Sequence, residues 1–355
     1  MKTKNRSVVI DKNRYGCPWI LDNLRTHVNE NNENPCWKAI DYCGPDPDFV
    51  PQIQQTYKTD DVLGPLYTAV VCLNKPRRTV AEALQRSQLP ISIPRNPKLT
   101  PMVIKCDAVV VGSGSGGGVV AGVLAKSGYK VLVLEKGNYR ARSNLSLLEG
   151  PSMDEMYLGK GLLATSNMEA VILAGSTVGG GSAVNWSASI KTPRHVRKEW
   201  SKSYELEMFE SGLYEEALDV VCERMGVQSE VVDEGFNNAV LRKGCGELGF
   251  PIENIPRNSP PDHYCGWCCL GCKDGRKKDV VGGLGGIGNG AILTGCEAVK
   301  VVHDRKPGRD RSTARGVLFE FQRQDGSKEV CLVESKVTIV ACELCARPGS
   351  LNEAG

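Results

Sequence analysis

The feature that most constrains this chain is a glycine turn between two short apolar runs. Residues 106–135 read CDAVVVGSGSGGGVVAGVLAKSGYKVLVLE, which is the order expected for a strand, a turn, a helix and a second strand. The apolar run from Ala108 to Val111 is typical of a parallel strand that is buried on both faces. Because parallel strands need a long crossover, usually a helix, this stretch predicts a βαβ unit.

Three glycines in the turn follow the GxGxxG spacing of a dinucleotide-binding loop. Gly112 would allow the tight turn, Gly114 would let the backbone approach a pyrophosphate, and Gly117 would let the helix pack closely on the strand. The helix that begins near Gly116 would direct its N–H groups and dipole at the phosphates. Glu135 ends the second strand and can take ribose hydroxyls, which disfavours a 2′-phosphate. The motif predicts a dinucleotide and does not distinguish FAD from NAD.

A second glycine-rich stretch follows a strand candidate at residues 170–174. Residues 175–186 read GSTVGGGSAVNW, so main-chain N–H groups and hydroxyls would be exposed together. Such a loop suits a phosphate or the edge of a flavin. Taken alone, a flexible surface loop is the simpler interpretation.

The bulk composition is that of a soluble globular protein. The chain has 355 residues, 41% of them hydrophobic, and a formal net charge of +3, so nothing indicates nucleic-acid binding. No window approaches about 18–20 consecutive apolar residues, so we expect no transmembrane helix. The opening sequence MKTKNRSVVIDKNRYG has no apolar signal-peptide core, and we therefore expect an intracellular chain with mostly reduced thiols.

Four of the fifteen cysteines form one dense cluster. Cys265, Cys268, Cys269 and Cys272 form two CxxC pairs that directly adjoin. Four thiolates could bind zinc or an iron–sulfur centre, but known sites separate their two pairs by roughly 15–20 residues. The spacing therefore favours cysteines without a metal, and it favours a structural or solvated role for the neighbouring His263. We assign no metal ligand from the sequence.

Weaker patterns predict the other elements. A capped helix is expected over residues 79–88 with Thr79 at its N-cap, within an otherwise proline-punctuated, irregular stretch. Two amphipathic helices are expected to turn apolar faces to the core, and a glycine-rich flexible loop precedes the last strands. The helices are residues 213–225 and 236–248, the loop is residues 282–290, and the strands are residues 291–302, 316–321 and 329–340.

Several motifs, taken in order, resemble the glucose–methanol–choline (GMC) oxidoreductases, and within them the plant long-chain fatty alcohol oxidases. The resemblance rests on the βαβ stretch, LEGPSMDEMY, ILAGSTVGGGSAVNWSASIKTP, DEGFNNAVLRKGC, IPRNSPPDHYCGWCCLGC and ILTGCEAVKV. It covers roughly residues 101–300, with fainter traces at residues 34–42 and 335–342.

The resemblance implies an incomplete GMC fold of the α/β class, built on a Rossmann-type FAD-binding domain with a parallel sheet. Its expected parts are an irregular region (1–100), the βαβ core and glycine loop (101–190), a helical and Cys-rich insert (191–280), returning strands (281–345) and a tail (346–355). It also implies that the second glycine loop lies against the flavin of FAD and that Ala298 offers its backbone to the adenine. The implied FAD contacts are Gly112, Ser113, Gly114, Ser115, Gly116, Gly117, Glu135, Lys136, Gly180, Gly181, Ser182, Asn185 and Ala298.

The resemblance also implies a reaction. A histidine takes the hydroxyl proton of a long-chain primary alcohol, hydride passes to the flavin, and dioxygen reoxidises it, at a membrane in the plant enzymes. No histidine of this chain corresponds to that base, so we assign no catalytic residue and expect little or no activity; the four are His27, His195, His263 and His303. The alternatives are a non-catalytic FAD- or nucleotide-binding fragment, an NAD-dependent dehydrogenase and a cysteine-cluster metal protein.

Overall fold

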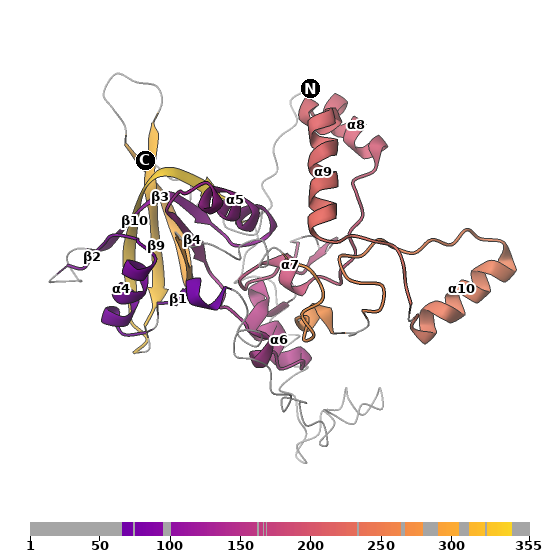
Figure 1. The fold of residues 1–355 in the computed structure, drawn as a ribbon, viewed down its shortest axis with the longest axis horizontal. Helices are drawn as coiled ribbons and strands as arrows, with labels where there is room; N and C mark the ends of the chain where they lie inside the picture. The colour runs from indigo at the N-terminus through magenta and orange to yellow at the C-terminus, as the bar shows by residue number, and fades with distance from the viewer. Residues whose placement is uncertain are drawn as a thin grey trace, which may run out of the picture. The chain divides into compact units, whose positions relative to one another are not determined.

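The computed structural model divides the chain into two compact units (Figure 1). Residues 1–184 with 280–355 form the first unit, and residues 185–279 form the second. The structure describes residues 66–73, 75–94, 101–161, 163–165, 167, 169–232, 234–263, 267–279, 290–304, 312–323 and 325–342.

The first unit is built on an eight-stranded sheet in the order β1-β7-β4-β3-β10-β9-β8, with β2 paired to β3 off this path. Strands β1, β7, β4, β3 and β10 run parallel, and β9, β8 and β2 pair antiparallel with their neighbours. This mixed sheet with helices confirms the predicted α/β class. The strands are β1 (Val70–Cys72), β2 (Ile91–Ser92), β3 (Met102–Val111), β4 (Val131–Glu135), β7 (Gly290–Thr294), β8 (Cys296–Asp304), β9 (Thr313–Gln322) and β10 (Lys328–Val340).

Each central strand buries side chains on both faces, as the apolar runs predicted. Val109 and Val111 of β3 join a core cluster with α4 (Arg77–Arg86) and with β9. Val110, which points the other way, packs with α5 (Ser115–Lys126). Because successive side chains of a strand alternate between faces, one short run of valines anchors a layer on each side of the sheet.

Three features of the first unit differ from the sequence predictions. Helix α4 begins at Arg77 with Pro76 at the N-cap, so the predicted cap at Thr79 is wrong. Proline fixes its own φ near the observed −51°, and its missing N–H costs nothing at a helix start. The predicted strand over residues 291–302 is two strands, because Gly295 has φ +71° and turns the chain between them. The third is β1, which adds a sheet strand within residues 1–100.

Short elements complete this unit. A two-stranded sheet pairs Leu163–Ala164 with Val171–Ile172, so the strand predicted over residues 170–174 is present in its central part. These elements are η1 (Tyr67–Ala69), η2 (Arg142–Asn144), α6 (Glu149–Met156), η3 (Leu158–Gly161), β5 (Leu163–Ala164), β6 (Val171–Ile172) and α7 (Gly181–Val184). Residues 282–289 of the predicted glycine-rich loop lie outside the described residues, and Gly290 begins β7.

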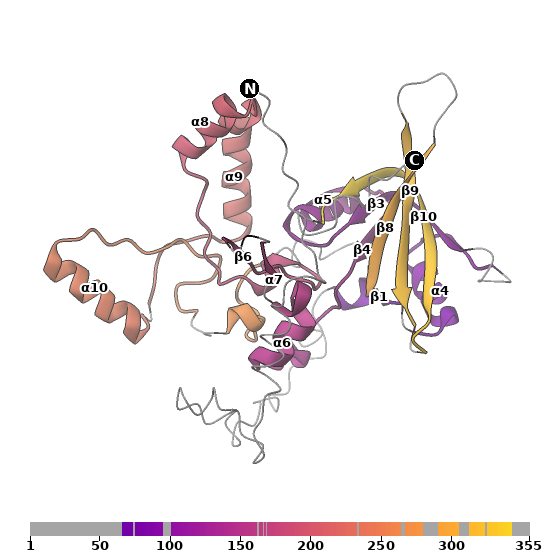
Figure 2. The same cartoon turned by 180° about the vertical axis from the view of Figure 1, so that it is seen from behind.

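The second unit contains the two predicted amphipathic helices, α9 (Gly212–Arg224) and α10 (Phe236–Leu248), which α8 (Arg194–Ser203) and η4 (Glu207–Glu210) precede. Their expected core faces are wrong: Leu213, Phe236 and Leu248 are 73%, 81% and 74% exposed. Helix α9 instead contacts its neighbours through aromatic rings, since Tyr214 packs edge-on against Phe209. In both views α10 stands apart from α8 and α9 (Figure 2).

From residue 249 to residue 279, the described part of the second unit has only one short helical turn, η5 (Cys268–Leu270). Several polar side chains of this stretch are nevertheless buried, including Asn258, Ser259, His263 and Lys277. Of the helices that the structure describes, none has the length and apolar character needed to cross a bilayer.

A partly exposed ion pair on the central sheet, between Asp107 and Lys336, can be tested by titration. Asp107 of β3 accepts hydrogen bonds from the Lys336 ammonium at 2.8 Å and from the Lys130 N–H at 2.9 Å. These contacts, Lys336 first, hold the pKa of the Asp107 carboxyl below its ordinary value. A depressed pKa stabilises the fold above the ordinary value, about 3.9, and that stabilisation is lost as the pH falls through the depressed pKa.

We therefore expect Asp107→Asn to lower Tm by roughly 2–4 °C at pH 7, the shift expected when a unit of this size loses one charge-assisted hydrogen bond. The gap between the variant and the wild type should narrow as the pH falls below ~4 and close only below the depressed pKa, where the folded wild-type carboxyl is protonated. Thermal unfolding of both proteins at several pH values measures this difference in Tm. A gap that stays constant into acid would contradict this assignment.

Candidate cofactor-binding site

The turn after β3 has the glycine geometry that the sequence predicted. Gly112 has φ +94°, and a Cβ there would lie 2.6 Å from the carbonyl oxygen of Ala341, just beyond β10. A Cβ on Gly117 would lie 2.0 Å from the carbonyl oxygen of Gly112. The first glycine therefore permits the turn, and the third permits the close contact between α5 and the end of β3.

The N-terminus of α5 is exposed and has no side-chain cap. Gly114 occupies the N-cap, and Ser115 and Gly116 at the start of the helix are exposed. The first N–H groups of a helix have no partner within it, and the helix dipole places partial positive charge there. The first turn of α5 carries no acidic residue. This end of the helix can therefore bind an anion such as a phosphate.

The second glycine loop lies against the first. Gly180 has φ +52°, and a Cβ there would lie 2.8 Å from the Cα of Gly114. A Cβ on Gly175 would in turn lie 2.5 Å from the carbonyl oxygen of Gly180. The two loops are thus in backbone contact, which only residues without a side chain allow at this distance. We call the two loops together the glycine cradle: residues 112–117 and 175–182.

One buried carboxylate connects the two loops. Glu135, 6% exposed, accepts hydrogen bonds from the Ser113 N–H at 3.0 Å and from the Ser113 hydroxyl at 2.6 Å, both on Oε2. Its Oε1 accepts from the Gly137 N–H at 2.8 Å. The Ser113 hydroxyl oxygen also accepts from the Gly179 N–H of the second loop at 3.1 Å. Burial raises the pKa of the Glu135 carboxyl, and these donors oppose part of that rise.

The end of β4 fixes the second loop further. The Thr177 hydroxyl donates to the Asn138 carbonyl at 2.7 Å, and the Val178 N–H donates to the same carbonyl at 3.2 Å. A Cβ on Gly137 would lie 2.0 Å from the carbonyl oxygen of Ser176. The sequence analysis missed Gly137, Asn138 and Thr177 as supports of the site. The available signal was the glycine two residues after the acid that ends the second strand.

The other residues that were predicted to contact FAD lie in several different parts of the structure. Lys136 forms an ion pair with Glu297 of β8, with 2.9 Å between Nζ and Oε1. Ala298 lies where the β8–β9 register shifts, so its strand is irregular at the position expected to meet the adenine. Ser182 is buried, and its hydroxyl donates to the Gly179 carbonyl at 2.7 Å.

Asn185 is the first residue of the second unit, and its side-chain oxygen accepts from the Ser187 N–H at 3.0 Å. The Lys277 ammonium lies 3.0 Å from the Asn185 carbonyl oxygen and 3.3 Å from its side-chain oxygen. The predicted role of Asn185 at the flavin remains a prediction. Glu135 was also expected to meet a ribose, whereas its hydrogen bonds in this structure are internal ones with Ser113 and Gly137.

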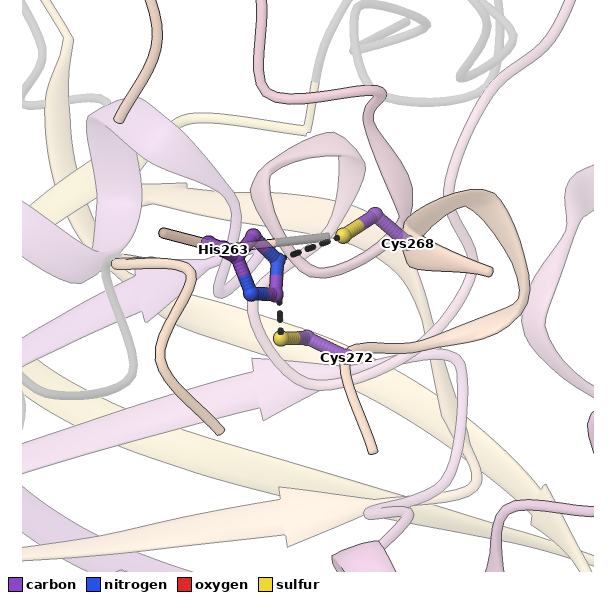
Figure 3. A group of neighbouring side chains, drawn as sticks. All are labelled: His263, Cys268 and Cys272. Carbon is purple, nitrogen blue, oxygen red and sulfur yellow. Dashed lines mark hydrogen bonds between the residues drawn. The ribbon is translucent and has the colours of Figure 1, made fainter. Parts of the chain in front are cut away.

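The cysteine cluster lies in the second unit, where it meets a histidine. His263 is 4% exposed and close to the sulfurs of Cys268 and Cys272 (Figure 3). Of the two roles expected for His263, structural or solvated, the burial of its side chain excludes the solvated one. Cys265 lies outside the described residues, and no cysteine that the structure describes is in a disulfide.

Comparison with known proteins finds a matching family and several similar proteins. The family described as GMC oxidoreductase matches residues 153–355. Long-chain-alcohol oxidase FAO4A of Arabidopsis thaliana is 54% identical over 93% of this chain, and long-chain-alcohol oxidase FAO1 of the same plant is 40% identical over 93%. The chain spans 47% and 43% of these two relatives, about half their length.

Solved structures resemble the fold at lower identity. A formate oxidase of Aspergillus oryzae aligns with a TM-score of 0.44 at 15% identity, covering 66% of this chain and 45% of that one. Pyridoxine 4-oxidase from Mesorbium loti aligns with a TM-score of 0.46 at 14% identity, covering 66% and 49%.

Two adjacent glycines of the second loop should respond differently to the same substitution. Gly180→Ala forces a side chain into the left-handed region and against the backbone of Gly114, so we expect a loss of about 1–3 kcal/mol in unfolding free energy. A Cβ on Gly181 meets no atom within 4 Å, and Gly181→Ala should be neutral. Denaturant unfolding of both variants measures this, and equal stabilities would contradict the contact between the loops.

Proposed function

Because this chain belongs to the GMC oxidoreductase family, we propose that its first unit is the FAD-binding part of a long-chain alcohol oxidase. In the proposed reaction a long-chain primary alcohol and dioxygen yield the aldehyde and hydrogen peroxide. The observation that carries the FAD assignment is the glycine cradle, in which the backbone of Gly180 touches that of Gly114. The substrate assignment rests on the relatives named long-chain-alcohol oxidases.

The cradle fits the diphosphate of a dinucleotide. The exposed N-terminus of α5, at Ser115 and Gly116, offers N–H groups and partial positive charge to the phosphates. At Gly114 a Cβ would meet only the Cα of Gly180, at 3.8 Å, so this face is open to an approaching phosphate. The nearest carboxylate, that of Glu135, is buried and already accepts from Ser113 and Gly137, which limits its repulsion of an anion.

Other features support FAD in particular. A single GxGxxG turn suffices for the ADP half that NAD and FAD share, whereas a second glycine loop held onto the first suits a larger cofactor. We therefore place the flavin beside Gly180, Gly181 and Ser182. We place the adenine near Ala298, where the β8–β9 ladder is irregular and a backbone group can bond outside the sheet.

In this proposal the residues of the glycine cradle bind and orient the cofactor but do not supply a base. When bound, a flavin supplies a two-electron acceptor for hydride. An alcohol is a much better hydride donor once a base has taken its hydroxyl proton. The Glu135 carboxylate, which accepts hydrogen bonds from Ser113 of the cradle, is buried in internal hydrogen bonds. A flavin-binding unit without turnover is therefore the second candidate function for these 355 residues.

The test is reconstitution with FAD followed by anaerobic addition of a long-chain primary alcohol. We expect the purified chain to retain FAD through gel filtration, with visible flavin absorbance, and to show no comparable retention of NAD. Colourless protein after reconstitution would contradict the FAD assignment.

For the alcohol step, dithionite serves as the positive control for flavin reduction. We expect dithionite to bleach the bound flavin and hexadecanol to leave it oxidised, because the Glu135 carboxylate beside the cradle is buried in internal hydrogen bonds. Bleaching by hexadecanol would exclude the second candidate and would show that the base lies among these 355 residues.

A further inference from the structure

Three side chains of the second unit converge on a single point. The Nε2 of His263 lies 3.3 Å from the Sγ of Cys268 and 3.9 Å from the Sγ of Cys272 (Figure 3). All three atoms lie within 4.8 Å of one another. The histidine is almost fully buried and the two cysteines are half-buried, so the three donor atoms are largely removed from bulk water.

These separations match the edges of a tetrahedral zinc site. With Zn–N near 2.0 Å and Zn–S near 2.3 Å, a tetrahedron places its nitrogen and sulfur ligands about 3.5 Å apart and two sulfurs about 3.8 Å apart. The observed nitrogen–sulfur distances of 3.3 and 3.9 Å lie on either side of that value. The two nitrogen–sulfur distances would reach that value with shifts of a few tenths of an ångström, and the two sulfurs lie within 4.8 Å of each other.

A carboxylate fixes the orientation of the histidine ring. The Nδ1 of His263 lies 2.9 Å from Oδ2 of Asp274, which favours the tautomer with its proton on Nδ1. The lone pair of Nε2 then faces the two sulfurs. Arg276 holds the same carboxylate, with its Nε 3.0 Å from Oδ2. A carboxylate behind a histidine in this way is the usual support of a histidine that binds zinc.

The sulfur of Cys272 also has two polar neighbours. The Lys277 N–H donates to Cys272 Sγ at 3.3 Å. The Cys272 thiol donates to Oδ1 of Asp274 at 3.0 Å. Binding of a metal would release that proton, because the thiolate is the ligand form.

We propose that His263, Cys268 and Cys272 bind one Zn²⁺ ion. The nitrogen and sulfur donors suit zinc and not magnesium or calcium, which take oxygen ligands, and an iron–sulfur cluster generally requires four cysteines. The site lies in the stretch from residue 249 to residue 279, where η5 is the only regular element among the described residues. An ion there would hold together a segment that has no helix or sheet ladder to do so. A fourth donor or a water molecule completes the tetrahedron.

Metal analysis of the purified chain tests the proposal. After expression with zinc and extensive dialysis, we expect about one zinc ion per chain. Cys268→Ser, Cys272→Ser and His263→Gln should each lose most of it. Cys245→Ser is the matched control, because Cys245 is a half-buried cysteine of the same unit on α10, and it should retain the metal. Zinc that is absent from the wild type, or equal in wild type and Cys268→Ser, would overturn the site.

Cobalt substitution keeps the test independent of whether the variants fold. Wild-type protein refolded with Co²⁺ should show the near-ultraviolet charge-transfer band of a cobalt–thiolate bond, and Cys245→Ser should show it too. Asp274→Asn should weaken the affinity for zinc roughly 10- to 100-fold, as expected for the carboxylate behind a ligand histidine. A cobalt-loaded wild type without a thiolate band, or iron in place of zinc, would refute the assignment.

Discussion

The proposed cofactor-binding site is built around the hydrogen bonds of one buried carboxylate, that of Glu135. An ionised group inside a protein is costly unless donors surround it, and here two N–H groups and one hydroxyl point at its oxygens. The hydroxyl belongs to Ser113, whose oxygen also receives the Gly179 N–H. The donors to the carboxylate belong to Ser113 and Gly137, and the second glycine loop joins this network through the Gly179 N–H, so the Ser113 hydroxyl links the two loops.

The parallel sheet explains why these pieces meet. Strands β3, β4, β7 and β10 point the same way, so the turns that leave them gather at one edge of the sheet. Gly112 after β3 touches the carbonyl of Ala341 after β10, and the Gly295 N–H after β7 donates to the carbonyl of Gly137 after β4. At Gly112 and Gly137 the close approach of backbone leaves no room for a side chain. These glycines are therefore needed for the packing of the backbone at this edge of the sheet as well as for the proposed binding of the ligand.

The sequence predicted a residue's role correctly where that role is determined by its neighbours along the chain. The roles of Gly112 and Gly117 follow from the turn itself, and the structure has both. Prediction failed where the cause lies elsewhere in the fold. The apolar pattern that predicted one strand continues through Gly295, so it gives no sign of the turn between β7 and β8. The turn is evident only in the fold, where Gly295 has a positive φ. The exposed stripes of α9 and α10 look like core faces in any local pattern. The cysteine cluster was judged by its CxxC spacing, whereas the converging sulfurs come one from each pair and meet His263.

The central claim is that main-chain groups of the glycine cradle hold the phosphates of FAD. The most direct test is the dissociation constant for FAD in Gly114→Ala beside Gly150→Ala, a glycine of α6 whose Cβ would meet no atom within 4 Å. At Gly114 the added methyl has ordinary room within the protein, with its nearest neighbour at 3.8 Å, but it occupies the face that a phosphate must approach. We predict that both variants fold, that Gly114→Ala binds FAD roughly tenfold more weakly, equivalent to about 1.4 kcal/mol, and that Gly150→Ala binds it with unchanged affinity. Equal affinity for FAD in the two variants would contradict this claim.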